Sequence, residues 1–245
     1  MENILEIKKL SKSFGGVHAV ADVSFQVRKG ETLGLIGPNG SGKSTCINLI
    51  SGVYTSDAGE ILFCGHNITK LSIPKRSRLG IGRTFQSPKP FIGMSVFDSV
   101  FTIALQTNSF KQAAGKTEEI LDMTGLLDFR SMLSEKLSIE LRKWLDLARI
   151  LATNPKLIML DEVMAGLNPS EMGESINLVK KINQTGVTVL FVEHVMKAVM
   201  SLCERIVVLN EGRILYEGLP GDVVSNPEVI TAYLGGGYAS AAGAE

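Results

Sequence analysis

The sequence predicts an α/β fold: a mostly parallel sheet flanked by helices, with an antiparallel β-subdomain at the N-terminus and an inserted all-helical subdomain. Three observations lead to this prediction. Short apolar runs alternate with stretches of helical spacing, residues 37–45 form a glycine-rich loop between a strand and a helix, and residues 94–152 keep helical spacing throughout. Strands that alternate with helices are typical of a parallel sheet covered on both faces.

The composition is that of a globular protein. Of the 245 residues, 44% are hydrophobic and 20% are charged, which excludes disordered and fibrous classes. The 25 basic and 25 acidic side chains cancel, so no nucleic-acid partner is expected. Three cysteines far apart favour a reducing cytoplasm over a disulfide framework. No apolar run approaches the ~20 residues of a membrane span, so any membrane contact would pass through another protein.

Residues 37–45 fit the phosphate-loop pattern G-x-x-x-x-G-K-[ST]. An apolar strand over residues 32–36 precedes the loop, and an apolar helix follows from residue 45. This context favours a P-loop NTPase core over an ordinary glycine-rich turn. Backbone N–H groups would surround a phosphate, Lys43 would reach the β- and γ-phosphates, and Ser44 would ligate Mg²⁺. The predicted nucleotide-binding residues here are Gly37, Pro38, Asn39, Gly40, Ser41, Gly42, Lys43, Ser44 and Thr45.

The N-terminal segment predicts two β-segments, residues 4–10 and 19–27, which turn at residues 15–16. Phe14 lies just before this turn, where an exposed ring could stack on a purine. In isolation, an aromatic residue at a strand end more often belongs to the core. Two further short strands are predicted over residues 59–65 and 80–86, and Gln86 begins a loop that contains prolines.

The helical spacing of residues 92–152 predicts an inserted subdomain that interrupts a core of residues 1–91 and 153–234. Acidic and basic residues nearly balance in the insertion, as on a solvated helical surface. Residues 235–245 are rich in glycine and alanine, and they are expected to form a flexible tail with no assigned function.

After the insertion, strands and helices alternate again. Strands are expected over residues 157–160 and 187–192, helices over residues 169–182 and 195–202, and a hairpin over residues 206–216.

Two carboxylates follow the strand over residues 157–160. Asp161 would hold Mg²⁺, and Glu162 could polarise the attacking water. An acid after an apolar strand is weak evidence by itself, but it becomes strong evidence together with the phosphate loop. His194 follows the next strand and could contact the γ-phosphate or orient Glu162, although a histidine in such a position is often an ordinary surface residue.

Several motifs occur in the order found in the nucleotide-binding subunits of ATP-binding-cassette (ABC) transporters, which residues 4–234 resemble. These motifs are Phe14, the phosphate loop, Gln86, Leu137-Ser138, Asp161-Glu162, Ala165-Gly166-Leu167-Asn168 and His194. Residues 82–86, 162–169 and 229–236 resemble the branched-chain amino acid importer group. That group's permease would import branched-chain amino acids or a similar small polar solute.

The resemblance implies roles and partners. Phe14 would stack on adenine, Gln86 would link Mg²⁺ to the permease contact, Glu162 would be the catalytic base and His194 the switch histidine. The cofactors would be ATP and Mg²⁺. Family members work as head-to-tail pairs, in which each ATP lies between one phosphate loop and the partner's signature segment, here represented by Ser138. The chain would then lie at the cytoplasmic face of the membrane, held there by transmembrane permease subunits.

This chain departs from the family at the signature segment. The family has Leu-Ser-Gly-Gly-Gln, whereas this chain has Leu137-Ser138-Ile139-Glu140-Leu141. The Glu140 carboxylate would repel a triphosphate, or it could simply complement its own helix dipole; both readings stay open. Asn168, where aspartate is usual, is a minor change. The two departures suggest an asymmetric pair, so a heterodimer with a second ABC ATPase is favoured over a homodimer.

The sequence therefore predicts an ATPase subunit that powers a membrane permease. Two alternatives remain: a soluble non-transport cassette ATPase acting on nucleic acid or ribosomes, and a regulatory cassette that binds ATP with little turnover. The chain carries no pocket for the cargo, so the substrate rests on the resemblance alone.

Overall fold

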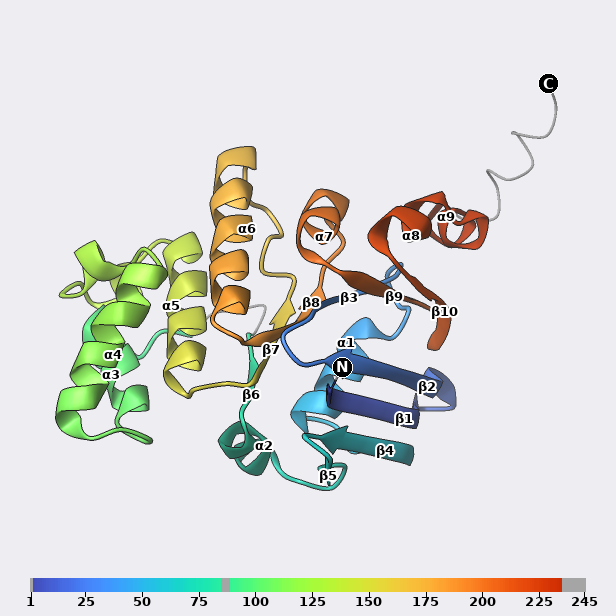
Figure 1. The fold of residues 1–245 in the computed structure, drawn as a ribbon, viewed down its shortest axis with the longest axis horizontal. Coiled ribbons are helices and arrows are strands. Elements are labelled where there is room, and N and C mark those ends of the chain that lie inside the picture. The colour runs from blue at the N-terminus through green and yellow to red at the C-terminus, as the bar shows by residue number, and fades with distance from the viewer. Residues whose placement is uncertain (1, 85–88, 235–245) are drawn as a thin grey trace.

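A computed structural model describes residues 2–84 and 89–234 and contains two sheets (Figure 1). The first is antiparallel, with strand order β2-β1-β4-β5. Its strands are β1 (Asn3–Phe14), β2 (Val17–Arg28), β4 (Ala58–Phe63) and β5 (His66–Asn67). The second has the order β10-β9-β3-β8-β7-β6 and is parallel except at its β10 edge. Its strands are β3 (Thr32–Ile36), β6 (Ile81–Arg83), β7 (Leu157–Asp161), β8 (Thr188–Val192), β9 (Arg205–Asn210) and β10 (Arg213–Gly218). The predicted fold class is confirmed.

The described residues form nine α-helices, of which the last two follow the final strand. They are α1 (Lys43–Ser51), α2 (Ile73–Leu79), α3 (Val96–Ala104), α4 (Phe110–Met123), α5 (Ile139–Ala152), α6 (Pro169–Gln184), α7 (Met196–Leu202), α8 (Pro220–Ser225) and α9 (Pro227–Leu234), with 3₁₀ turns at Leu127–Phe129 and Ser134–Lys136. The sequence analysis missed the three short helices α2, α8 and α9. A proline in the first turn of each was the signal available.

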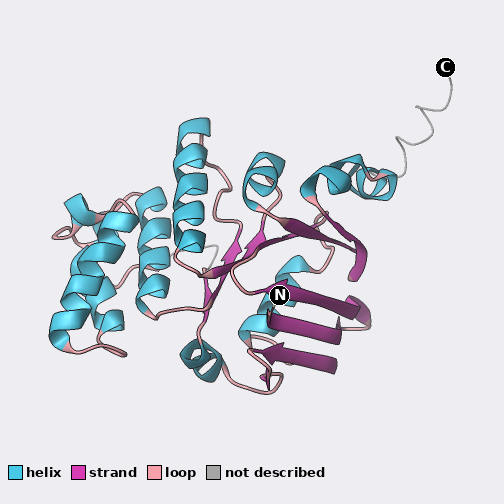
Figure 2. Cartoon of the chain, in the orientation of Figure 1, coloured by secondary structure: helices cyan, strands magenta, loops and turns pink. Residues whose placement is uncertain are grey.

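The parallel sheet separates two hydrophobic cores. Leu157 and Met159 point to a core shared with α1 and the antiparallel sheet, whereas Ile158 and Leu160 point to a core shared with α6 and α7. Because both faces are covered, strands β3, β7 and β8 are buried along their whole length. Figure 2 shows α6 and α7 on one side of this sheet and the antiparallel sheet on the other.

Helices α3, α4 and α5 pack on one another as a group at one end of the molecule (Figure 1). Polar caps set their starts: the Ser95 side chain accepts from the N–H of Asp98, and Ser109 forms a capping box with Gln112. This group occupies the stretch predicted to be an inserted helical subdomain.

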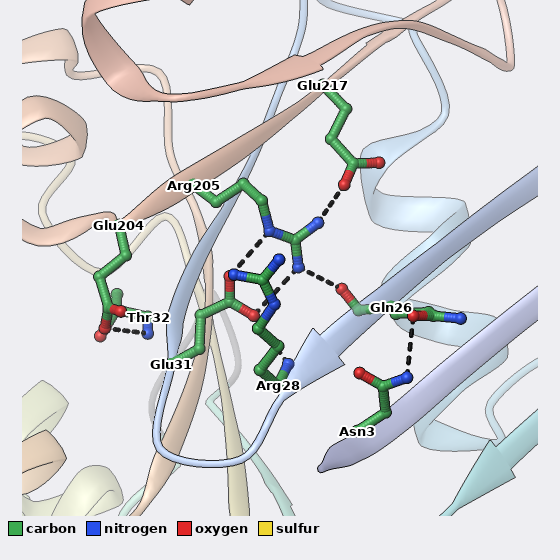
Figure 3. A network of polar contacts seen from close by, with 8 residues as sticks. All are labelled: Asn3, Gln26, Arg28, Glu31, Thr32, Glu204, Arg205 and Glu217. Atoms are coloured by element: carbon green, nitrogen blue, oxygen red, sulfur yellow. Dashed lines mark hydrogen bonds and ion pairs between the residues drawn. The ribbon is translucent and has the colours of Figure 1, made fainter. Parts of the chain in front are cut away.

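The partly buried side chain of Arg205 joins the antiparallel sheet to the parallel sheet (Figure 3). The Arg205 guanidinium donates to both carboxylate oxygens of Glu31, at 2.9 and 3.0 Å, and to the carbonyl oxygen of Gln26 at 2.7 Å. It also pairs with Glu217 on β10. Since Gln26 belongs to β2 and Arg205 to β9, one side chain connects the two sheets.

Among the described residues, no helix has the length and apolar character needed to cross a bilayer.

Candidate functional site

The phosphate loop turns sharply out of buried β3 into α1. Gly42 takes the helix N-cap position with a φ of 103°, and a Cβ there would lie 2.4 Å from the carbonyl oxygen of Ala19. Only glycine fits this close approach of β2. Helix α1 begins without a side-chain cap and without an acidic residue in its first turn. Its first N–H groups and the positive end of its dipole therefore remain available to an anion.

Lys43 lies inside the loop. Its ammonium donates to the carbonyl oxygens of Gly37 at 2.8 Å and Pro38 at 3.0 Å, and the residue is only 8% exposed. Burial lowers the Lys43 pKa, while the charges of Glu162 and Asp161 act in the opposite direction. The Ser41 hydroxyl is buried with no hydrogen-bond partner. A cation and an unsatisfied hydroxyl in one loop are suited to bind phosphate oxygens.

Asp161 ends β7 and is 2% exposed. Its Oδ2 accepts from Arg83 at 3.0 Å, whereas its Oδ1 is buried with no hydrogen-bond partner. Burial raises the pKa of this carboxyl group. Ser44 is exposed and lines the same cavity, of about 720 Å³, as Asp161. An unpartnered carboxylate oxygen and a hydroxyl on one cavity are the donor set that suits Mg²⁺.

Glu162 and His194 follow neighbouring strands of the parallel sheet. Glu162 has a left-handed backbone with a φ of 52°, and its N–H donates to the carbonyl oxygen of Val192 at 2.9 Å. His194 comes two residues after Val192, and its side chain is 55% exposed. Because β7 pairs with β8, and β8 with β3, the C-terminal ends of these strands bring the phosphate loop, both carboxylates and the histidine to one edge.

Phe14 lies at the end of β1 and is 43% exposed. Its ring makes an edge contact with Tyr54 at a centroid distance of 5.1 Å, and the Lys12 ammonium lies 5.5 Å from its centroid. The expectation of an exposed ring at the turn is therefore met, and Phe14 is not a core residue. Tyr54, which follows α1, was not anticipated as its neighbour.

The structure places Ser138 at the start of α5, in the helical group and not beside α1 (Figure 1). Its hydroxyl accepts from the N–H of Leu141 at 3.3 Å. Glu140 lies in the first turn, and a hydrogen bond from Ser138 lowers the pKa of its carboxyl group. The Glu140 carboxylate therefore complements its own helix, as one of the two readings of the sequence expected. Gln86 lies outside the described residues.

Three functional candidates escaped the sequence analysis. Arg83 donates to Asn48 at 2.5 Å and to Ser51 at 3.1 Å, and so ties α1 to Asp161. The Tyr233 hydroxyl on α9 receives a hydrogen bond from the backbone of Gly37, and burial raises its pKa to about 12. Glu193 is fully buried beside His194. Arg83 and Tyr233 lie in residues 82–86 and 229–236, whose resemblance gives neither residue a role, and nothing in the sequence separates Glu193 from an ordinary strand-end acid.

Comparison with known proteins agrees with this geometry. The family model described as ABC transporter matches residues 20–165, which contain the phosphate loop and both carboxylates. The chain belongs to the ABC transporter ATP-binding family. A second family model, described as branched-chain amino acid ATP-binding cassette transporter, matches residues 213–239. As a member of this family, the chain is an ATP-binding subunit and an ATPase whose hydrolysis is coupled to transport through a transmembrane permease.

Individual relatives of this ABC ATPase cover nearly its whole length. The high-affinity branched-chain amino acid transport ATP-binding protein LivG of Salmonella typhimurium is 35% identical, over 95% of this chain and 98% of LivG. The lipopolysaccharide export system ATP-binding protein LptB of Acidithiobacillus ferridurans is 34% identical, over 96% and 98%. The crystal structure of an ABC-transporter ATP-binding cassette in its ADP conformation superposes with a TM-score of 0.86 at 31% identity, covering 96% of this chain and 100% of that one.

Proposed function

We propose that this ABC ATPase powers the uptake of branched-chain amino acids or a similar small polar solute. The observation that carries this assignment is the match of residues 213–239 to the branched-chain family model, supported by the likeness to LivG. Lipopolysaccharide export is the competing cargo, because LptB is almost as similar.

The chemistry that we propose is in-line attack of water on the γ-phosphate of ATP. Lys43 exchanges its bonds to the loop carbonyls for bonds to the β- and γ-phosphates, and the free N–H groups of α1 hold the β-phosphate. Glu162 orients the attacking water as catalytic base, and His194 contacts the γ-phosphate. Phe14 stacks on adenine with Tyr54 as its support.

We further propose that the reaction uses Mg²⁺ bound by Ser44 and Asp161, with Gln86 as a further ligand. The unpartnered Oδ1 of Asp161 supports this proposal, since a buried carboxylate oxygen without a donor favours a cation. The metal would neutralise charge on the phosphate oxygens. Arg83 holds the other oxygen of Asp161 and so orients the carboxylate.

Partners follow from the altered signature. Because Ser138 and Glu140 already satisfy the N-terminus of α5, we propose that this segment is a weak phosphate ligand. The competent site would then combine this chain's phosphate loop with the signature of a second, different ABC ATPase. The pair would lie at the cytoplasmic face of the membrane and touch the membrane only through the permease, without nucleic acid as a partner.

We propose that the permease contacts the cavity beside Asp161. Its far side is lined by Phe91, Ile103 and Arg149, and the neighbouring Ile92 is 84% exposed. Exposed apolar side chains next to a cavity are typical of a protein contact. Thr84 and Lys89, which flank residues 85–88 in the sequence, line the same cavity.

Two measurements test the proposal. The first is uptake of radioactive leucine by cells that carry or lack the gene, with a lysine uptake assay as control. Loss of leucine uptake alone is expected, and unchanged leucine uptake with a lipopolysaccharide export defect would assign the competing cargo.

The second measurement is recovery of the protein after mild detergent extraction, where a second ABC ATPase and permease subunits are expected to be recovered with it. Recovery as a homodimer with full turnover would contradict the heterodimer.

A further inference from the structure

Glu193 is a buried carboxylate for which the proposed chemistry has no use. It follows β8 directly, between Val192 and His194, and is 0% exposed. Burial raises its pKa, while two backbone hydrogen bonds and His194 oppose the shift. Burying a carboxylate costs free energy unless hydrogen bonds offset the loss of water. What this residue contacts is therefore informative.

The two carboxylate oxygens of Glu193 hold two different segments. Oε1 accepts from the N–H of Met164 at 2.7 Å. Oε2 accepts from the N–H of His194 at 3.3 Å and lies 4.0 Å from that residue's Nδ1. Met164 is fully buried in the loop of residues 162–168, which runs from the candidate base Glu162 to the cap of α6. One side chain thus bridges this loop and the candidate switch histidine.

The same loop is held from the opposite side by the helical group. Lys143 on α5 donates through its ammonium to the carbonyl oxygen of Ala165 at 3.1 Å. Ala165 in turn donates its N–H to the carbonyl oxygen of Glu162 at 3.4 Å. The loop is therefore held at two adjacent residues, Ala165 by Lys143 and Met164 by Glu193, and Glu193 also accepts from His194.

We propose that Glu193 is a positioning residue that couples His194 to the loop of residues 162–168. When His194 approaches the γ-phosphate, the Glu193 carboxylate transmits that displacement to Met164, and the loop adjusts the position of Glu162. Hydrogen bonds from N–H groups to a buried carboxylate are stronger than neutral ones, so the connection is stiff. The inference rests on the proposed contact of His194 with the γ-phosphate, and it adds a mechanical link between the histidine and the base.

The first test uses NMR, because the chain has only three histidines, His18, His66 and His194. In Glu193→Gln, we expect the imidazole resonances of His194 to move on loss of the adjacent charge, while those of His18 and His66 stay in place. ATP addition should also shift the methyl resonance of Met164 in the wild type, and this shift should be smaller in Glu193→Gln. Glu204→Gln is the matched control, since Glu204 is exposed and accepts from the N–H of Thr32 at 3.3 Å, away from residues 162–168 and His194 in the sequence.

The second test is steady-state ATP hydrolysis in the complex with the partner subunits. Misplacing a catalytic group by about 1 Å can cost about a hundredfold in rate, so we expect kcat to fall by about tenfold to a hundredfold in Glu193→Ala. The KM for ATP should change less than threefold, because the phosphate loop is untouched. Glu193→Gln, which keeps the shape and one acceptor, should recover part of the loss, and it serves if Glu193→Ala fails to fold.

The outcomes separate this inference from the roles on which it rests. An ATP-induced shift of the Met164 resonance that is as large in Glu193→Gln as in the wild type would overturn the coupling. An unchanged kcat in folded Glu193→Ala would also overturn it. Normal turnover in His194→Ala would instead overturn the proposed role of the histidine, whatever the NMR result. Lys143→Met should lower kcat in the same direction if the loop must be held from both sides.

Discussion

Two helices of this ABC ATPase begin at segments that the sequence predicts to bind phosphate, and their N-termini differ in the hydrogen-bond donors that they leave free. Helix α1 starts at Gly42 with no side-chain cap and no acidic residue, so its N–H groups stay open. Helix α5 starts at Ser138, whose hydroxyl caps the helix, and carries Glu140 in the first turn. Because an anion at a helix N-terminus is bound by N–H groups that lack other partners, α1 offers the better anion site of the two.

The largest effect is expected at the open helix. Lys43→Met removes the one ammonium group in the phosphate loop, residues 37–45. That ammonium would stabilise negative charge on the phosphoryl group that is transferred. We expect the rate of ATP hydrolysis to fall by at least about a hundredfold. Lys29→Met, which replaces an exposed lysine, is the control and should leave the rate unchanged. Comparable rates in the two variants would mean that the loop does not bind the triphosphate.

The second largest effect is expected on stability, at the C-terminal end of α1. Arg76 is buried and donates to the carbonyl oxygens of Leu49, Ile50, Thr69 and Leu71 at 2.6–2.9 Å, so it closes the C-terminus of the helix. Arg76→Met would leave these carbonyls without their donor and lower the free energy of unfolding by about 3 kcal/mol. Urea denaturation measures this loss. Exposed Arg78→Met is the control, and an equal effect there would contradict the capping role.

Removing the acidic residue from the first turn of α5 should make its N-terminus more like that of α1. The double substitution Ile139→Gly with Glu140→Gly restores a flexible N-terminus without a carboxylate. We expect turnover of the isolated chain to rise about tenfold, which corresponds to about 1.4 kcal/mol of transition-state stabilisation. The free energy of unfolding should fall by about 1 kcal/mol from the glycines.

Asp98→Gly, in the first turn of α3, is the matched control for this double variant. It should lose similar stability without any gain in turnover. If the double-glycine variant is no more active than the wild type, the closed N-terminus is not what limits the isolated chain.

The smallest effect concerns pH and the buried carboxylate beside the open helix. Burial raises the pKa of Asp161 above its value in the unfolded chain. The protonated carboxyl group therefore contributes to the free energy of unfolding at low pH, and this contribution is lost as the pH rises through the folded pKa. Without nucleotide, the melting temperature of Asp161→Asn relative to wild type should therefore rise with pH, from about pH 4 upward. Differential scanning calorimetry across this range measures the trend, and a difference that falls with pH would contradict the raised pKa.

The features that depend on the spacing of nearby residues could be predicted from the sequence. The phosphate loop, the strands on either side of it and the acids after β7 could be predicted because each depends on neighbours within a few residues. Helix α2 was missed although Pro74 follows its first residue, because seven residues are too few to show a clear periodicity. The same reason applies to α8 and α9.

What the sequence determined by itself is the identity of the chemical groups: a glycine-rich anion loop, two carboxylates, a histidine and a signature that carries an acid. Only the tertiary structure decided which of them have partners. Arg83 reaches Asp161 across 78 positions, and Glu193 reaches Met164 across 29. Such contacts depend on the order of strands in the sheet. Hydrophobic burial and backbone pairing over the whole chain set that order, so these contacts cannot be predicted from a local sequence pattern.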